Sequence, residues 1–220
     1  MAVTKADILA EIDAIFSALG AQQQLVSDQL TAGEMYEAWV LAHVLDELHR
    51  REGFEFRLVG GTKPVLKASP GPINTNYPHF EGECEGRRIA VWTDIEFRTF
   101  SFFRRSTSPY PDVGDKHELD IVVVPSGTIG YPAHDEILWG IECKHTAFQK
   151  HMARAALGVR RELSLLASDK PTFFRRWPTV RVPAGPPSVV TVYSTSSAVT
   201  KYRGAGEVFG IEFTELPLPR

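Results

Sequence analysis

The feature of this sequence that most constrains its fold is the run LDIVVVP at residues 119–125. Every position from 121 to 124 is aliphatic, and a strand this apolar is usually covered on both faces. Such a strand needs a sheet with a further layer on each side, which indicates an α/β domain. The run also makes Asp120 unusual, because a carboxylate inside an apolar strand is costly unless it is paired or binds something.

A second predicted strand, ILWGIECKH at residues 137–145, also carries charges inside an apolar pattern. Side chains alternate between the faces of a strand, so the odd-numbered positions from 137 to 143 are predicted to face a core. Glu142 and Lys144 then point to the other face, where Gly140 is expected to leave open space above the carboxylate. A strand, a turn and a strand would place Asp120 opposite Glu142. Two carboxylates and a lysine that converge in this way form an oxygen-rich site suited to Mg²⁺.

The rest of the chain indicates helices before the sheet and between its later strands. Apolar residues recur at three- and four-residue spacing in residues 4–19, which is typical of an amphipathic helix with Thr4 as its N-cap and Gly20 as its stop. Further helices are predicted at about 22–30, 34–51 and 147–167, and strands at 54–60, 79–86, 87–98, 119–125, 137–145, 188–195 and 207–213. The order predicts an α/β fold with a mixed central sheet flanked by helices, consisting of an N-terminal helical arm at residues 1–32 and one domain at residues 33–220.

Asp120, followed after a gap by Glu142-Cys143-Lys144, resembles the D…E-x-K signature of the restriction-endonuclease-like (PD-(D/E)XK) nuclease superfamily. The strand context is similar too, since Glu118-Leu119-Asp120 resembles the E-[LI]-D strand of that family. The resemblance covers about residues 33–167. It implies a restriction-endonuclease-like core in which Asp120, Glu142 and the backbone carbonyl of Cys143 bind Mg²⁺, with Mn²⁺ as a substitute. It also implies that Asp120, Glu142 and Lys144 are catalytic.

The resemblance further implies a catalytic glutamate on a helix before the sheet, often in the pattern G-x-x-[YF]-E. Residues 33–37, GEMYE, fit this pattern and make Glu37 the candidate. Glu37 shares a helix face with Leu41 and Val44, so it is predicted to point inward. Glu34, one turn earlier, is a rival for the same role.

Two other interpretations of the site stay open. Pro111-Asp112 offers a literal "PD" upstream, although it lies in a loop rich in Ser, Pro and Gly, so Asp120 is preferred as the ligand. Glu142 and Lys144 could also be an ion pair on the solvated face of an edge strand.

Two groups of residues are predicted to contact nucleic acid. Gln149 and Lys150 follow the strand at 137–145, where a helix is expected to begin. Arg104 and Arg105 follow a run of phenylalanines, and aromatic and basic side chains together suit a nucleic-acid groove. The alternative is that the aromatic residues belong to the core and the arginines to a solvated rim. The net charge of −3 argues only against a protein that coats nucleic acid by bulk charge.

These features predict a DNA endonuclease of restriction or defence type. One site per chain predicts a homodimer, since two chains can cut two strands. The alternative is a catalytically silent nucleic-acid-binding or assembly subunit with the same fold, but the complete set of Asp, Glu and Lys argues against it. Cys84 and Cys143 match no zinc spacing, and no signal peptide or membrane-spanning segment is recognisable, so we expect a cytoplasmic protein.

Overall fold

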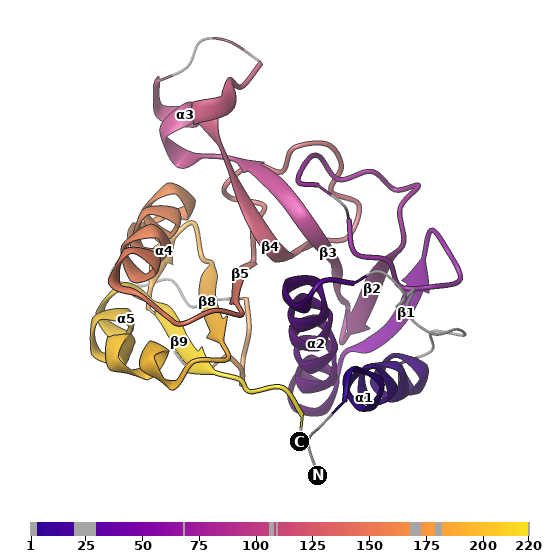
Figure 1. Cartoon of the computed structure of the whole chain (residues 1–220). Coiled ribbons are helices and arrows are strands. Elements are labelled where there is room, and N and C mark those ends of the chain that lie inside the picture. The colour runs from indigo at the N-terminus through magenta and orange to yellow at the C-terminus, as the bar shows by residue number, and fades with distance from the viewer. Residues whose placement is uncertain are drawn as a thin grey trace.

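The computed structural model describes residues 4–19, 30–67, 69–105, 108, 110–167, 173–178 and 182–219 of the chain. Its strands are, in chain order, Glu55–Val59 (β1), His79–Cys84 (β2), Arg87–Arg98 (β3), Lys116–Pro125 (β4), Trp139–Lys144 (β5), Leu165–Leu166 (β6), Ala184–Gly185 (β7), Val189–Ser194 (β8) and Ile211–Glu215 (β9). A seven-stranded sheet in the order β1-β2-β3-β4-β5-β8-β9 forms the centre of the molecule (Figure 1). Neighbours from β1 to β5 are antiparallel, whereas β5, β8 and β9 are parallel. The predicted mixed sheet is therefore confirmed.

Helices cover both faces of this sheet. They span Lys5–Ala18 (α1), Ala32–Glu47 (α2), Phe100–Arg105 (α3), Lys150–Leu163 (α4) and Arg203–Phe209 (α5), with a π-helical turn at Leu48–Glu52 and 3₁₀ turns at Val113–Asp115 and Ser197–Tyr202. Figure 1 shows α1 and α2 on one side of the sheet and α4 and α5 on the other. No helix in the described ranges is long and apolar enough to cross a membrane.

The position of β4 between two hydrophobic cores explains why its sequence is so apolar. Ile121 and Val123 belong to the core that includes α1 and α2, whereas Val122 and Val124 belong to the core that includes α4. All four side chains are fully buried. The prediction that this strand is covered on both faces is confirmed. Asp120 directly precedes the residues that are buried on the two faces.

Helix α1 begins as its sequence predicts, with Thr4 as its N-cap. Helix α2 begins at Ala32, two residues before the predicted start, and Thr31 is its N-cap. Each cap is part of a capping box with an acid three residues later. Helix α1 packs against α2, and its Ile12 and Phe16 are buried in the shared core. The π-helical turn that continues α2 ends at Gly53, whose φ of 82° lies in the left-handed region that glycine adopts without strain. Gly20 and residues 22–29 of the helix predicted at 22–30 lie outside the described residues, and Leu30 is not helical.

The structure corrects the predicted bounds of two elements and adds a helix. Residues 207–209, predicted to begin the last strand, belong to α5, and the strand starts only after the turn at Gly210. The apolar residues Val208 and Phe209 lie on this helix, where they are 62% and 42% exposed. Helix α4 spans Lys150–Leu163 rather than 147–167, since its last predicted residues form the short strand β6. Helix α3 was not predicted.

Candidate active site

The structure brings Asp120, Glu142 and Lys144 together. Strands β4 and β5 are antiparallel neighbours that pair Ile121 with Ile141, and the same register continued by one residue places Asp120 opposite Glu142. The Lys144 ammonium lies 2.6 Å from Glu142 Oε2 and 3.5 Å from Asp120 Oδ2. Asp120 Oδ2 also accepts a hydrogen bond from the backbone N–H of Cys143 at 2.5 Å. One ammonium thus contacts both carboxylates where the two strands stop pairing.

Glu37 lies on α2, which packs against β4 and β5. It is half-buried, on the same helix face as the buried Leu41 and Val44. Burial, followed by the negative charges of Asp120 and Asp94, raises the pKa of Glu37 to about 8. The rival Glu34 has a different task, because its Oε2 accepts a hydrogen bond from the backbone N–H of the N-cap residue at 2.7 Å.

Asp94 on β3 is a further acid of the group, and it was missed at the level of the sequence. The pairs Thr93 with Ile121 and Ile95 with Leu119 flank it, so it lies opposite Asp120. Asp94 is 8% exposed, and burial together with the charge of Asp120 raises its pKa to about 7. Its signal was available, because a charged residue interrupts the apolar strand 87–98 just as Asp120 interrupts 119–125.

Negative charge dominates this site. Burial and the charge of Asp120 raise the pKa of Glu142, against the effect of Lys144. Burial alone would lower the pKa of Lys144, but Glu142 and Asp120 outweigh it and raise the pKa above its ordinary value. The ammonium therefore stays charged, yet the negative charge of Asp120 still raises the pKa values of Glu37, Asp94 and Glu142. A further cation would stabilise the ionised carboxylates of such a site.

The oxygen donors of this site suit Mg²⁺ better than a metal that takes all of its ligands from the protein. Within the described ranges, no three side chains of His, Cys, Asp or Glu are placed so that they could hold a metal ion by themselves. Mg²⁺ does not need such a cage, since it keeps several waters and binds through one or two carboxylates and substrate phosphates. Asp120 and Glu142 supply two carboxylates, and one oxygen of Asp94 is buried without a partner. These oxygens suit a hard divalent cation.

Two expectations about β5 were wrong. A side-chain carbon at Gly140 would lie 2.9 Å from Leu119 Cδ1, so the leucine fills the space that was expected to be open. Ile137 belongs to the core on the α4 side, opposite to the core that holds Trp139 and Ile141. The reason is that β5 begins only at Trp139, so the alternation of faces does not extend back to residue 137.

The predicted nucleic-acid contacts lie at two other places. Gln149 is the N-cap residue of α4 and Lys150 its first residue, and both are exposed. Arg104 is exposed on α3, where its neighbour Arg105 forms an ion pair with Asp115. Figure 1 shows α3 projecting beyond the ends of β3 and β4. Their role in binding stays a prediction.

Asp112, the literal alternative to Asp120, has a local structural role. It is exposed and caps the 3₁₀ turn Val113–Asp115 in a capping box with Asp115. This agrees with the preference for Asp120 as the candidate ligand.

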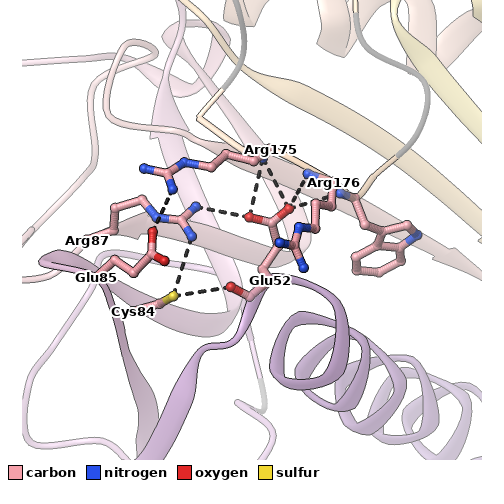
Figure 2. Close-up of polar contacts among 7 residues, drawn as sticks. Glu52, Cys84, Glu85, Arg87, Arg175 and Arg176 are labelled. Carbon is pink, nitrogen blue, oxygen red and sulfur yellow. Dashed lines mark hydrogen bonds and ion pairs between the residues drawn. The ribbon is translucent and has the colours of Figure 1, made fainter.

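A second polar cluster surrounds Glu52 at the end of the π-helical turn, as Figure 2 shows. The Glu52 side chain is 1% exposed and lies 3.0 Å from Arg87 Nη1. Its carboxylate also accepts hydrogen bonds from the backbone N–H groups of residues 175–177. Burial raises the pKa of Glu52, but these donors outweigh it and the pKa is lowered. Trp177 is buried and Arg176 is exposed.

No protein-family model matches the chain, and the searches found neither a similar curated protein nor a similar solved structure. The functional interpretation therefore rests on the residues of the site and on the motif that they resemble.

Proposed function

We propose that this chain is a Mg²⁺-dependent nuclease that hydrolyses phosphodiester bonds, with DNA as its substrate and a restriction or defence role. The observation that carries the proposal is the contact of one ammonium, Lys144, with carboxylates from two neighbouring strands. A half-buried acid in each strand and a lysine two residues after the second acid also match the D…E-x-K pattern of the restriction-endonuclease-like family.

In the proposed reaction the protein positions the water and the phosphate and supplies charge. The oxygen of a water molecule attacks phosphorus, the bond to the leaving sugar oxygen breaks, and that oxygen takes up a proton. A bound Mg²⁺ supplies Lewis acidity, polarising a phosphate oxygen and lowering the pKa of water. Asp120, Glu142 and the carbonyl of Cys143 would hold the cation.

Lys144 has the task of orienting the attacking water and stabilising negative charge that develops on the phosphate. Its raised pKa keeps it an ammonium at neutral pH, which suits this role better than that of a base. Glu37, with its pKa raised to about 8, lies on the helix side of the same group and would bind water near the cation. A homodimer, with one such site per chain, is part of the proposal because it lets both strands of DNA be cut.

The test is cleavage of plasmid DNA, linear DNA and RNA by the purified chain in Mg²⁺, Mn²⁺ or EDTA. We expect cleavage with either metal and none in EDTA. Asp120→Asn should abolish cleavage, whereas the same substitution at the rival position, Asp112→Asn, should preserve it. Nucleic-acid binding without cleavage by the wild-type chain would identify a silent subunit instead. Cleavage in EDTA, or undiminished cleavage by Asp120→Asn, would disprove the proposed site.

A further inference from the structure

A cavity of about 330 Å³ is formed by residues of α4, β6 and the last residue of α5. It is lined by Leu157, Arg160, Arg161, Ser164, Leu166 and Phe209. Three of these residues are apolar and two are basic, and none of the described residues that line the cavity is acidic. Small-molecule sites typically combine such a volume and an apolar wall with a few polar or charged groups. The lining therefore indicates a ligand with an apolar part and a negative charge.

Arg160 is a buried cation in the wall of this cavity. The residue is 4% exposed, and its guanidinium donates to two neutral acceptors, the backbone oxygen of Phe209 at 3.0 Å and Ser188 Oγ at 2.8 Å. Its Nη2 is buried without a hydrogen-bond partner among the described residues. Burial lowers the pKa of Arg160 to about 10, and no acid in the described part of the chain opposes this effect. A buried cation is costly unless an anion pairs with it.

The cavity has a polar inner end and an apolar mouth. Ser164 is 4% exposed, and its hydroxyl lies 3.3 Å from that of Ser188, the residue to which Arg160 donates. In contrast, Leu166 and Phe209 are 50% and 42% exposed. A ligand that entered past these two apolar side chains would therefore meet a hydroxyl and a guanidinium at the inner end.

The cavity is separate from the candidate active site. Strands β5 and β8 are parallel, and Lys144 pairs with Ser194 at the end of both strands. Arg160 contacts Ser188, which directly precedes the start of β8. The cavity and the candidate active site thus lie toward opposite ends of these two strands. A ligand in the cavity would be bound by groups that the proposed nuclease reaction does not use.

We propose that this cavity binds a small organic carboxylate with an apolar tail. The carboxylate would pair with the guanidinium of Arg160 and accept a hydrogen bond from Ser164, while the tail would pack on the apolar residues of the mouth. Arginine and carboxylate groups match in geometry. A singly charged group balances one buried guanidinium, whereas a phosphate dianion would bring excess negative charge into an apolar cavity. The inference goes beyond the proposed nuclease and does not depend on it.

Calorimetric titration of the full chain with octanoate tests the inference. Octanol, which has the tail without the charge, and acetate, which has the charge without the tail, are the matched ligands. We expect one octanoate per chain, and binding of octanol and acetate that is weaker by about tenfold or more, because each lacks one of the two contributions. Absence of octanoate binding, or binding of either matched ligand as tightly as octanoate, would overturn the inference.

Two variants test the position of the ligand. Arg160→Gln should weaken octanoate binding by about tenfold or more and leave the affinity for octanol unchanged. Leu166→Glu should also weaken octanoate binding, because it adds a negative charge at the mouth, and the exposure of this position should allow the variant to fold. Arg154→Gln is the matched control, since Arg154 is exposed on the same helix and does not line the cavity. It should bind octanoate like the wild type.

Circular dichroism shows whether each variant is folded. Octanoate binding by folded Arg160→Gln with wild-type affinity would overturn the inference. If Arg160→Gln does not fold, Leu166→Glu decides, and wild-type affinity in that variant would overturn the inference in the same way.

Discussion

Lys144 holds its charge because two carboxylates outweigh the effect of its burial. Its pKa is raised by Glu142 and Asp120, so at neutral pH it is an ammonium that cannot accept a proton from water. In the proposed reaction it acts by position and charge. A donor of this kind stabilises the transition state more than the bound substrate, and it therefore affects turnover more than affinity.

We predict that Lys144→Ala lowers the single-turnover cleavage rate by about 10²-fold or more, the scale seen when a transition-state donor is removed. Binding of nucleic acid in Ca²⁺ should stay within a few-fold of the wild type. Lys144→Met, which keeps the apolar stem, should fold and be equally inactive. Lys201→Ala should cleave normally, since Lys201 is exposed on the 3₁₀ turn Ser197–Tyr202. A wild-type rate in Lys144→Ala would reduce this residue to a structural ion pair.

The sequence predicted some residues of the site and missed others for a physical reason. Asp120, Glu142 and Lys144 could be placed together because two apolar strands joined by a short excursion pair with each other, and each acid interrupts its strand. Asp94 joins them only through the register of β3 against β4, which are separated by a helix and a loop. Gly140 was misjudged because the leucine that covers it comes from the neighbouring strand.

At the scale of elements, hydrogen bonds to Glu52 hold the segment 175–177 against the end of the π-helical turn. Its carboxylate is the shared acceptor of three backbone N–H groups and the partner of Arg87 (Figure 2). A side chain that satisfies so many buried donors joins two parts of the chain that are distant in sequence. Loss of its charge should therefore destabilise the fold without touching the acids of the candidate site.

We predict that Glu52→Gln lowers the free energy of unfolding at pH 7 by about 1–3 kcal/mol, because Arg87 and the backbone donors lose a charged acceptor. Glu85→Gln is the control, since Glu85 pairs with Arg175 on the exposed surface and should have an effect of about 0–1 kcal/mol. Denaturant unfolding measures both. Equal effects of the two substitutions would contradict the role of Glu52.

The difference in the free energy of unfolding between wild type and Glu52→Gln should depend on pH. The pKa of Glu52 is lower in the folded chain than its ordinary value of 4.5. Its stabilising effect is therefore fully present above pH 4.5 and is lost as the pH falls through the folded-state pKa. The gap between wild type and Glu52→Gln should shrink over that acid range, and a gap that widened there would be evidence against the assignment.

The boundaries of elements show the limit of pattern reasoning. Helix α1 was predictable because its capping residue and its apolar spacing agree. The start of β9 was not, since Phe209, Ile211 and Phe213 alternate with Gly210 and Glu212. Phe209 nevertheless belongs with Val208 to a helix that leaves both exposed. Short pieces such as α3 carry too few residues for a period to be recognised.

At the scale of the whole molecule, several acids lie where the helices no longer cover both faces of the central sheet. The layered α/β arrangement followed from the apolar strands, which need a layer on each face. The mutual proximity of the acids depends on tertiary structure, and so does their electrostatic state. Burial and mutual repulsion raise the pKa of Glu37 to about 8 and of Asp94 to about 7, and they raise the pKa of Glu142 as well. Folding of the metal-free chain therefore concentrates negative charge that divalent cations would neutralise.

We predict from this that divalent cations stabilise the chain, and more so at higher pH. Carboxyl groups with raised folded-state pKa values bind more protons folded than unfolded between about pH 4.5 and 8, so the metal-free chain loses stability as pH rises through that range. Metal must displace these protons, so its effect should grow from pH 6 to pH 8. Mg²⁺ or Mn²⁺ at about 100 times its dissociation constant should add about 2.7 kcal/mol, which raises Tm by about 5–10 °C for a domain of this size. Asp120→Asn should abolish the shift and Asp112→Asn should retain it. Thermal melts at both pH values, with metal or EDTA, would contradict the metal site if the cations left Tm unchanged, or if Asp120→Asn responded like the wild type.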